Sequence, residues 1–344
     1  MGFYRRNRDD WGKQMARDFD VIAMGNAIVD VIAAVDDGFL LKHNIAKGIM
    51  TLVDEYRANQ LYHAFAERRE VAGGSAANTM AGLASLGAKG IFVGKVKSDR
   101  LGESFLASMK DIGVRFVTPF ASDGPPTACC LVAVAPDGQR SMNTHLGASR
   151  ELGPDDIDVA EIASADILYI EGYLWDTESA KAASRKAIAV AKDAGTRVAF
   201  TLSDPFCVGR YREEFLELME NDLDIIFANE DEAKALFEVE TFDEVLQHLG
   251  PWSGIAALTR SAKGCVVTGG GEVHVIDAAP IAHVVDTTGA GDQFAAGFLF
   301  GLCRDKSLGA SGKLGVLAAG EIISHYGARP ETSLEVLAAN ASLL

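Results

Sequence analysis

Short, almost fully apolar runs alternate with longer amphipathic stretches along most of the chain. The short runs are rich in β-branched side chains and predict buried strands at 21–24, 31–35, 91–93, 167–170, 198–200, 225–227 and 255–258. The amphipathic stretches predict helices at 76–86, 101–109, 179–194, 212–219, 231–237, 291–302 and 314–326. Apolar strands between helices indicate a mostly parallel sheet covered on both faces, which is an α/β fold.

Two segments interrupt this alternation of strands and helices. Residues 35–53 and 119–143 alternate between apolar and polar positions as strands do, and the second contains a Pro-Asp-Gly turn at 136–138. Each is too short for a core of its own, so we expect the two to form a small β-lid over the carboxyl ends of the central strands. The expected large domain comprises residues 18–34, 54–118 and 144–344, and residues 1–17 form a polar, tag-like or disordered tail.

Composition narrows the range of partners. The net charge of −16 argues against binding to nucleic acid or to an anionic membrane surface. No apolar stretch approaches the ~20 residues that a membrane span needs. The five cysteines are odd in number and match no metal-binding spacing, which predicts reduced residues in a cytoplasmic protein. A phosphate ligand is still compatible with the acidic charge, because backbone N–H groups can bind an anion locally.

The glycine turn Gly289-Ala290-Gly291-Asp292 opens a strongly apolar helix. Unpaired N–H groups at a helix start, left accessible by the two glycines, form a pocket for an anion. A carboxylate there repels phosphate, but it is useful where a substrate hydroxyl must lose its proton. The turn therefore predicts an anion hole with Asp292 as general base. Taken alone, it also fits a capped helix with Asp292 in its first turn.

Two clusters in the first quarter of the chain predict a site for a hydroxyl-bearing substrate. Asn26 and Asp30 follow the first predicted strand, and a carboxylate can accept hydrogen bonds from two adjacent hydroxyls. Gly73 and Gly74 precede a predicted helix that contains Asn78, and glycines let the backbone approach a ligand closely. Taken alone, each cluster also fits an ordinary turn.

Two further clusters predict how a nucleotide is held. Asn229 and Glu232 share a helix face after a strand and can orient a hydrated Mg²⁺, although a helix cap explains them equally. Thr259 and Gly264 bound a segment that offers hydroxyl, N–H and cationic groups to a triphosphate, with a hairpin turn as the alternative. The chain has neither a Walker A loop nor the loops of protein kinases, so we expect another scheme for the nucleotide.

Together these clusters resemble the PfkB, or ribokinase-like, family of carbohydrate and nucleoside kinases. Residues 73–113 and 286–299 are similar to the two family signatures, and 229–232 to its NxxE motif. The similarity spans residues 19–330 in the expected order. The resemblance implies a three-layer α/β/α fold with a mostly parallel central sheet and a small β-lid. It also implies ATP and Mg²⁺ as cofactors.

The resemblance further implies roles for single residues. Asp292 takes the proton from the substrate hydroxyl, and residues 289–291 form the anion hole. Glu232, together with its NxxE partner, places Mg²⁺ through water. Asp286 and Thr288 match positions that line a monovalent-cation site in relatives, which suggests K⁺ as a further cofactor.

Other features point towards a nucleoside. Residues 73–78 lack the lysine that ribokinases usually carry there. Three stretches resemble the adenosine kinases of the family. The resemblance implies that Arg140 approaches the phosphate and that Met142, Phe206 and Tyr173 contact the base. A flat purine needs apolar and aromatic walls, which a free sugar does not. Ordinary core packing is the alternative for each of the three apolar side chains.

These observations predict an ATP- and Mg²⁺-dependent kinase that phosphorylates the 5′-hydroxyl of a nucleoside by direct in-line transfer, with adenosine to AMP as the expected reaction. The alternatives are a kinase of ribose, fructose or a related furanose, a kinase of inosine or guanosine, and a noncatalytic nucleoside-binding protein. We expect a monomer or a homodimer. Gln293 stands where many relatives have Ala or Ser, and we expect it to act on the ATP side.

Overall fold

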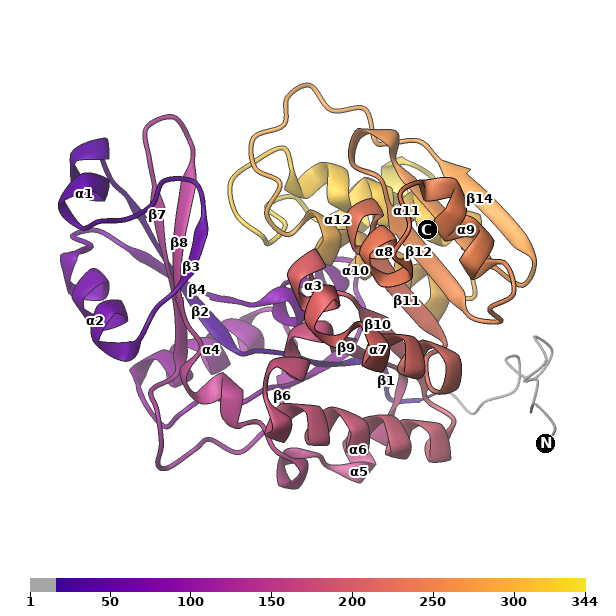
Figure 1. Ribbon diagram of the computed structural model, residues 1–344, viewed down its shortest axis with the longest axis horizontal. Coiled ribbons are helices and arrows are strands. Elements are labelled where there is room, and N and C mark those ends of the chain that lie inside the picture. The colour runs from indigo at the N-terminus through magenta and orange to yellow at the C-terminus, as the bar shows by residue number, and fades with distance from the viewer. Residues whose placement is uncertain (1–16) are drawn as a thin grey trace.

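The computed structural model describes residues 17–344 and is built around a nine-stranded sheet (Figure 1). In chain order its strands are β1 (Phe19–Met24), β5 (Gly90–Val93), β6 (Arg115–Phe116), β9 (Ala165–Glu171), β10 (Arg197–Thr201), β11 (Ile225–Asn229), β12 (Ile255–Thr259), β13 (Cys265–Gly269) and β14 (Glu272–Ile276). Their order across the sheet is β14-β13-β12-β11-β10-β9-β1-β5-β6. The pairings of β13 with β12 and of β14 with β13 are antiparallel, and the other pairings are parallel.

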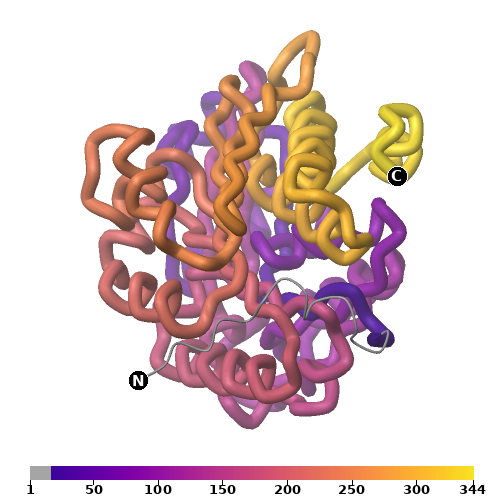
Figure 2. The backbone as a smooth tube through the Cα atoms, turned by 90° about the vertical axis from the view of Figure 1, so that its right-hand side faces the viewer, coloured from indigo at the N-terminus to yellow at the C-terminus, as the bar shows by residue number. Residues whose placement is uncertain are grey.

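Helices cover both faces of this sheet, and the sequence of β1 shows why. Val21 and Ala23 belong to one hydrophobic core, whereas Ile22 and Met24 belong to the other, so all four positions at the carboxyl end of the strand are buried. The first core packs under α3 (Ser75–Ser85), α4 (Arg100–Asp111), α10 (Ala290–Cys303), α11 (Leu308–Ile322) and α12 (Leu334–Asn340). The second packs under α5 (Val159–Ala163), α6 (Glu178–Ala194), α7 (Pro205–Asn221), α8 (Glu230–Phe237) and α9 (Phe242–Leu249). The side view in Figure 2 also separates α10 and α11 from the helices of the second core. The predicted three-layer fold is therefore confirmed.

A second, five-stranded sheet lies to one side of the large one, at the left in Figure 1. Its strands, in the order across the sheet, are β3 (Met50–Leu52), β8 (Arg140–His145), β7 (Ala128–Val134), β2 (Ile28–Ala34) and β4 (Arg69–Gly73). The helices α1 (Asp37–Lys42) and α2 (Glu55–Ala64) accompany it. We call this sheet with its two helices the lid.

The lid is larger than the sequence pattern indicated. β2 and β4 lie in segments that we assigned to the large domain, and residues 35–53 contain the helix α1. Val29 and Val31 of β2 are fully buried while alternate positions are not, which is the pattern of a sheet covered on one face. A short apolar run does not reveal which of two sheets it joins, because β2 pairs with β7, about a hundred residues later in the chain.

Three helix boundaries also differ from the prediction. The helix expected at 212–219 is the second half of α7, which begins at Pro205 with Asp204 as its cap and is interrupted at Tyr211. α11 begins at Leu308, earlier than expected, and ends at Ile322. Proline is well tolerated at the first helical position, so the Asp-Pro pair begins the helix seven residues before its predicted start.

Two expectations from composition can be compared with the described residues. All five cysteines are free thiols; four are buried and Cys303 is partly buried. Among the residues that the structure describes, no helix has both the length and the apolar character needed to cross a membrane. The predicted tail, apart from Arg17, lies outside the described residues.

Candidate active site

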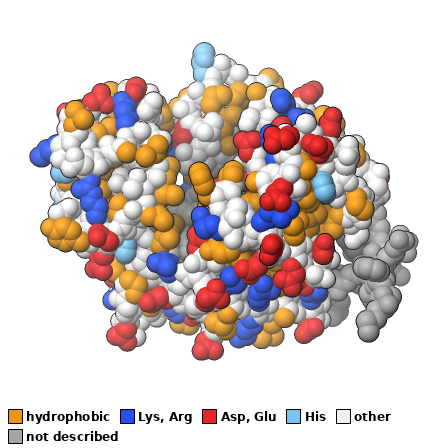
Figure 3. Space-filling view, viewed as in Figure 1, with side chains coloured by type: hydrophobic (Ala, Val, Ile, Leu, Met, Phe, Trp, Pro, Cys, Tyr) orange, Lys and Arg blue, Asp and Glu red, His pale blue; other side chains and the backbone are white. Residues whose placement is uncertain are grey.

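The predicted site residues gather where the parallel strands of the large sheet end. β1 ends at Met24 and continues through Gly25, Asn26 and Ala27 into β2 of the lid. β9, β10, β11 and β12 end at the same edge. Ligands of open α/β sheets bind at the carboxyl ends of the strands. Figure 3 shows the molecule hollowed between the lid and the rest of the chain, with hydrophobic side chains along the hollow.

Asp292 lies in the first turn of α10 and is held by α3. Its carboxylate accepts hydrogen bonds from Ser75 Oγ at 2.6 Å and from Asn78 Nδ2 at 3.1 Å. Burial raises the pKa of this carboxyl to about 6, and the two hydrogen bonds oppose that rise. The group is therefore ionised at neutral pH and is poised to accept a proton, as a general base requires.

The turn before Asp292 has the geometry of an anion site. Gly289 caps α10 in the left-handed conformation, with φ 79°, and lies so close to Ala328 that a Cβ would come within 2.8 Å of it. Gly291 is exposed, and a Cβ there would meet nothing within 4 Å. The first-turn N–H groups of a helix lack intrahelical partners, and the space beside Gly291 lets an anion reach them.

The two predicted substrate loops touch through their glycines. A Cβ on Gly73 would lie 2.5 Å from Asp30 Oδ2, and a Cβ on Gly74 would lie 2.3 Å from the carbonyl oxygen of Asn26. Gly74 also has a φ of 92°, which disfavours other residues. The glycines therefore bring Asn26, Asp30 and the start of α3 into one cluster. Burial raises the pKa of the Asp30 carboxyl to about 6, although the charges of Arg140 and Arg329 oppose this rise.

Glu171 is a site residue that the sequence analysis missed. It ends β9, is fully buried, and accepts hydrogen bonds from the backbone N–H of Asn26 at 2.7 Å and of Ala76 at 3.0 Å. It thus ties both substrate loops to the end of β9. Burial raises its pKa to about 7. The available sign was that a glutamate directly follows the apolar run 167–170.

Gln293 lies at the contact between α10 and α3. It is fully buried, and its Nε2 donates to the carbonyl oxygens of Asn78 at 2.8 Å and Ala328 at 3.0 Å. A Cβ on Gly82 would lie 2.1 Å from Gln293 Oε1, so α3 needs a glycine to accommodate this side chain. Gln293 therefore joins α10 to α3 and to the C-terminal segment, and its expected effect on the ATP side stays a prediction.

Arg140 and Asp286 form a buried ion pair between the lid and the loop before α10. Arg140 Nη1 lies 2.7 Å from Asp286 Oδ2, and both side chains are less than 10% exposed. Asp286 also accepts hydrogen bonds from Thr288 N, Thr288 Oγ1 and Gly327 N. Although burial opposes it, these hydrogen bonds and the charge of Arg140 lower the pKa of Asp286. The proposed monovalent-cation role of Asp286 and Thr288 stays a prediction, because their contacts within the protein account for this geometry.

Asn229 and Glu232 form a capping box at the start of α8. Asn229 Oδ1 accepts from Glu232 N at 2.8 Å, and Glu232 Oε2 accepts from Asn229 N at 3.0 Å. These contacts show that the two residues cap the helix, which was the alternative to a role in Mg²⁺ binding. Burial raises the pKa of Glu232 to about 7. A nearby divalent cation favours the ionised form, so the carboxylate fits a role beside hydrated Mg²⁺.

The segment from Thr259 to Gly264 is the connection of the β12–β13 hairpin. Residues 261–263 form one 3-10 turn, and Gly264 has a φ of 78°. A Cβ there would lie 2.0 Å from the carbonyl oxygen of Ile276, so the glycine is required by the packing of the hairpin. Thr259 ends β12 at the edge that carries the other site residues. A contact of this segment with ATP stays a prediction.

The three predicted base contacts differ in exposure. Phe206, in the first turn of α7, is 80% exposed, which argues against core packing for it. Met142 is partly buried on β8 and lies opposite Met50 of β3, which is 53% exposed. Tyr173 packs against the second core, and its backbone N–H donates to Ser203 Oγ at 3.3 Å. Phe206 and Met142 are therefore available to a ligand, whereas Tyr173 is mostly a packing residue.

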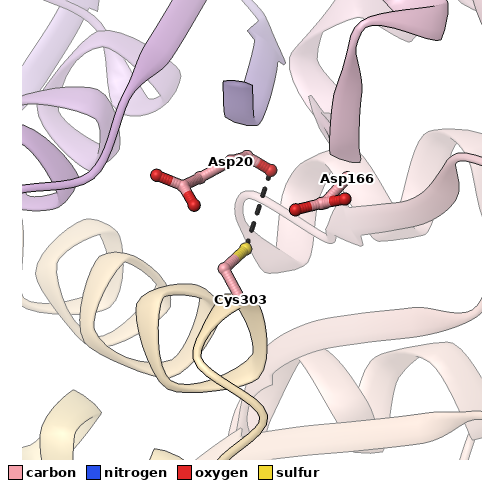
Figure 4. A group of neighbouring side chains, drawn as sticks. All are labelled: Asp20, Asp166 and Cys303. Atoms are coloured by element: carbon pink, nitrogen blue, oxygen red, sulfur yellow. Dashed lines mark hydrogen bonds between the residues drawn. The ribbon is translucent and has the colours of Figure 1, made fainter. Parts of the chain in front are cut away.

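One group of potential metal ligands lies at the other end of the strands. Asp20, Asp166 and Cys303 lie close together near the starts of β1 and β9 and the end of α10 (Figure 4). The Asp20 carboxylate already accepts from Lys89 N at 2.7 Å and from Arg304 Nη1 at 2.5 Å. The Cys303 thiol lies 3.6 Å from the carbonyl oxygen of Asp20, and burial raises its pKa to about 12. These contacts indicate a structural cluster.

Comparison with known proteins extends these observations. Residues 46–334 match the model of the pfkB family of carbohydrate kinases. The crystal structure of adenosine kinase from Sinorhizobium meliloti is 49% identical, with a TM-score of 0.86, over 94% of this chain and 99% of that one. A probable sugar kinase from Rhizobium etli is 46% identical, with a TM-score of 0.88, over 95% and 100% of the two chains. Adenosine kinase 2 of Arabidopsis thaliana is 27% identical over 338 residues, which cover 89% of this chain and 94% of the relative. The chain therefore belongs to the pfkB family of carbohydrate kinases and is a phosphotransferase of that family.

Proposed function

We propose that this kinase phosphorylates the 5′-hydroxyl of a nucleoside, with adenosine as the substrate and AMP as the product. The observation that carries the chemistry is the carboxylate of Asp292, held by Ser75 and Asn78 beside the open turn at Gly291. A base next to an anion site is suited to one step, in which a hydroxyl attacks a phosphoryl group and loses its proton.

The substrate sugar is held by the two loops that meet at their glycines. Asp30 accepts hydrogen bonds from the adjacent hydroxyls of the ribose, and Asn26, Gly73 and Gly74 form the wall of the sugar site. Asn78 contacts the sugar and also donates to Asp292, so it aligns the 5′-hydroxyl with the base. Glu171 fixes both loops through backbone hydrogen bonds and so maintains their spacing.

The residues for the nucleotide fit ATP with Mg²⁺. The first-turn N–H groups at Gly291 stabilise charge on the transferred phosphoryl, and Arg140, which the lid brings to Asp286 beside this turn, adds a positive charge. Glu232 lies at the carboxyl edge, where a hydrated Mg²⁺ would favour the ionised form of its carboxyl. When bound, ATP supplies the phosphoryl group and Mg²⁺ neutralises charge on its phosphates.

The preference for a purine rests on apolar side chains that the core does not need. Phe206 and Met50 are largely exposed, and Met142 is partly exposed, at the edges of the lid and of α7. Such side chains can sandwich a flat base, and an aromatic pair contributes ~0.5–1.5 kcal/mol beyond its buried area. The 49% identity to a bacterial adenosine kinase supports the same choice.

A sugar kinase is the second candidate. The probable sugar kinase from Rhizobium etli is nearly as similar, at 46% identity. Every residue proposed for the base, the anion hole and the sugar serves this reaction too. The two candidates differ only in whether Phe206 and Met142 contact the substrate.

A coupled ADP-release assay with MgATP separates them, run side by side with adenosine, inosine, guanosine, ribose and fructose. We expect turnover on adenosine to exceed that on ribose by at least ~100-fold, because a buried aromatic contact adds about 3 kcal/mol to transition-state binding. Phe206→Ala should reduce kcat/KM for adenosine and leave any ribose activity unchanged. Turnover on free sugars alone would overturn the nucleoside proposal, and equal loss on both substrates would assign Phe206 to the scaffold.

A further inference from the structure

The C-terminal segment 324–333, which follows α11, forms a wall of the sugar site. We call it the strap. Asp286 accepts a hydrogen bond from Gly327 N at 3.1 Å, and Gln293 donates to the carbonyl oxygen of Ala328 at 3.0 Å. Glu321 of α11 accepts from the backbone N–H groups of residues 331 and 332 at 3.0 and 2.8 Å. The strap is thus fixed at several points to the elements that carry the proposed base and anion hole.

A cavity of about 100 Å³ lies between the strap and the lid. Asp30, Asn78 and Arg140 line it from one side, and Tyr326, Ala328 and Arg329 line it from the strap. Asn78 also donates to Asp292, so the cavity adjoins the proposed base.

The cavity is lined by residues whose buried polar atoms lack partners. Asn78 Oδ1, Arg140 Nε and Arg329 Nε are buried and have no hydrogen-bond partner among the described residues. Buried polar groups are nearly always paired, so an acceptor and two donors without partners, on residues that line one cavity, favour a polar ligand there. Adjacent hydroxyls satisfy such a set, because each hydroxyl both donates and accepts.

Arg329 is the cation that the strap brings to this cavity. Its Nη1 donates to Ser108 Oγ at 3.0 Å, and its Nη2 lies 3.6 Å from Met109 Sδ, so the side chain spans from the strap to α4. Burial lowers the pKa of Arg329 to about 10, against the charge of Asp30, and the guanidinium is still charged at neutral pH.

Asp30 faces charges from each element packed around it. Arg140 comes from β8, Arg329 from the strap and Asp292 from α10, and all three act on its ionisation. Arg69 of β4 and Glu331 of the strap line the same cavity, and Cys130 of β7 lies beside Asp30 in the lid. The two arginines favour the ionised carboxylate, whereas burial and Asp292 oppose it.

We propose that Arg329 is a positioning residue for substrate specificity: its charge, on the cavity that it shares with Asp30, supports the Asp30 carboxylate as the acceptor for two adjacent hydroxyls of the substrate. The inference rests on the proposed function for the identity of the substrate, but its chemistry requires only a diol. A carboxylate accepts from both hydroxyls of a diol, and a fixed cation nearby favours the charged form of the carboxylate.

Arg329→Met tests this, with Arg329→Lys as the variant that keeps the charge. Arg115→Met is the matched control, because it removes an arginine that pairs with Glu161 on the surface. The substrates are adenosine, 2′-deoxyadenosine and 3′-deoxyadenosine. In Arg329→Met we expect kcat/KM for adenosine to fall by ~10–100-fold, through KM more than kcat, while the two deoxynucleosides change little. Arg329→Lys should restore part of the loss.

An equal loss on all three substrates would overturn the proposal, since that is the result of a purely structural role, and so would unchanged kinetics. Failure of the proposed function looks different, because the wild type would then leave adenosine unphosphorylated. In that case ribose and 2-deoxyribose provide the same comparison.

A readout without substrate completes the test. The Asp30 carboxyl can be titrated by ¹³C NMR in the full-length protein and assigned with Asp30→Asn. Arg329→Met should shift the Asp30 midpoint to higher pH, because a cation that favours the charged form is lost. An unchanged midpoint would show that Arg329 does not act on Asp30, whatever the substrate is.

Discussion

At the scale of single residues, the site concentrates carboxyl groups in places where burial disfavours their charge. The pKa values of Asp30 and Asp292 are raised to about 6, and those of Glu171 and Glu232 to about 7. Perturbed carboxyls of this kind are typical of functional sites. Asp286 is the exception: although burial opposes it, hydrogen bonds from Thr288 lower its pKa.

Asp292→Asn should lower kcat by ~10³-fold, because the amide cannot accept the proton of the attacking hydroxyl. Nucleoside affinity, measured by calorimetry without ATP, should change little, since the new amide oxygen can accept from Asn78 while its NH2 group donates to the Ser75 hydroxyl. The contrasting result is retained turnover, which would assign the proton to another group or to a stepwise route. A noncatalytic binder would be indifferent to the change.

The activity of the wild type should fall on the acid side of pH 6. Asp292 and Asp30 both have pKa values of about 6, and both act in the ionised form. Two groups that must lose a proton give a limb of log(kcat/KM) against pH steeper than one. The profile of Asp30→Asn should keep an acid limb with a slope of one. A wild-type profile flat down to pH 5 would contradict both assignments.

Stability should respond in the opposite sense to activity. The pKa of Asp292 in the folded state is about 6, above its ordinary value of 3.8, so its charge destabilises the fold above pH 6 and this cost disappears as pH falls to 4. Asp292→Asn should therefore raise the free energy of unfolding by ~1–3 kcal/mol at pH 7.5 and by less at pH 5. Asp286→Asn is the matched comparison. Because the pKa of Asp286 is lowered, it should destabilise at pH 7.5, as urea unfolding at the two pH values would show.

At the scale of elements, the site is a junction of α3, α10 and β2, and glycines make the close approach feasible. Gly74 faces Asn26, Gly82 faces Gln293, and Gly289 faces Ala328, each too closely for a Cβ. Gln293, Ser75 and Asn78 then join α3 to α10 by side-chain hydrogen bonds. The two predicted substrate loops are brought together by this packing.

Gly74→Ala should weaken nucleoside binding by at least ~10-fold, because the position has a φ of 92° and the added Cβ would lie 2.3 Å from the carbonyl oxygen of Asn26. Gly209→Ala, in α7, is the control. A Cβ there meets nothing within 4 Å, and alanine favours a helix by ~1 kcal/mol over glycine. Calorimetry and thermal melts would compare the variants, and equal affinity in the two would refute the role given to Gly74.

At the scale of the whole molecule, the lid and the large sheet meet over the site through a buried ion pair. Arg140 of the lid binds Asp286 of the loop before α10, and a Cβ on Gly138 would lie 2.5 Å from Tyr326 Oη of the strap. These contacts connect the lid to the proposed catalytic end of α10. A closed lid excludes water, which competes with the substrate for the phosphoryl group.

Arg140→Met should lower kcat for phosphoryl transfer by ~10–100-fold and raise the share of ATP hydrolysed without an acceptor. Lys47→Met is the control. Its ion pairs with Asp37 and Asp137 lie within the lid, at 2.8 and 2.7 Å, so the lid stays joined to the large sheet. Phosphate release compared with AMP formation measures the ratio. If Lys47→Met changes it as much as Arg140→Met, the effect comes from the lid's stability rather than from the bridge.

The sequence by itself determined the class of fold and predicted the core of the chemistry, because both depend on local pattern. Apolar strands between helices specify a covered parallel sheet, and the glycine turn before Asp292 specifies an anion site next to a carboxylate. The tertiary structure decided which residues meet across long distances in the chain. The membership of β2 and β4 in the lid, the contacts of Glu171 and the contacts of Gln293 all depend on partners more than thirty positions away in sequence. The hydrophobic periodicity of a sequence predicts that a side chain is buried, but only the assembled fold shows which residues it packs against.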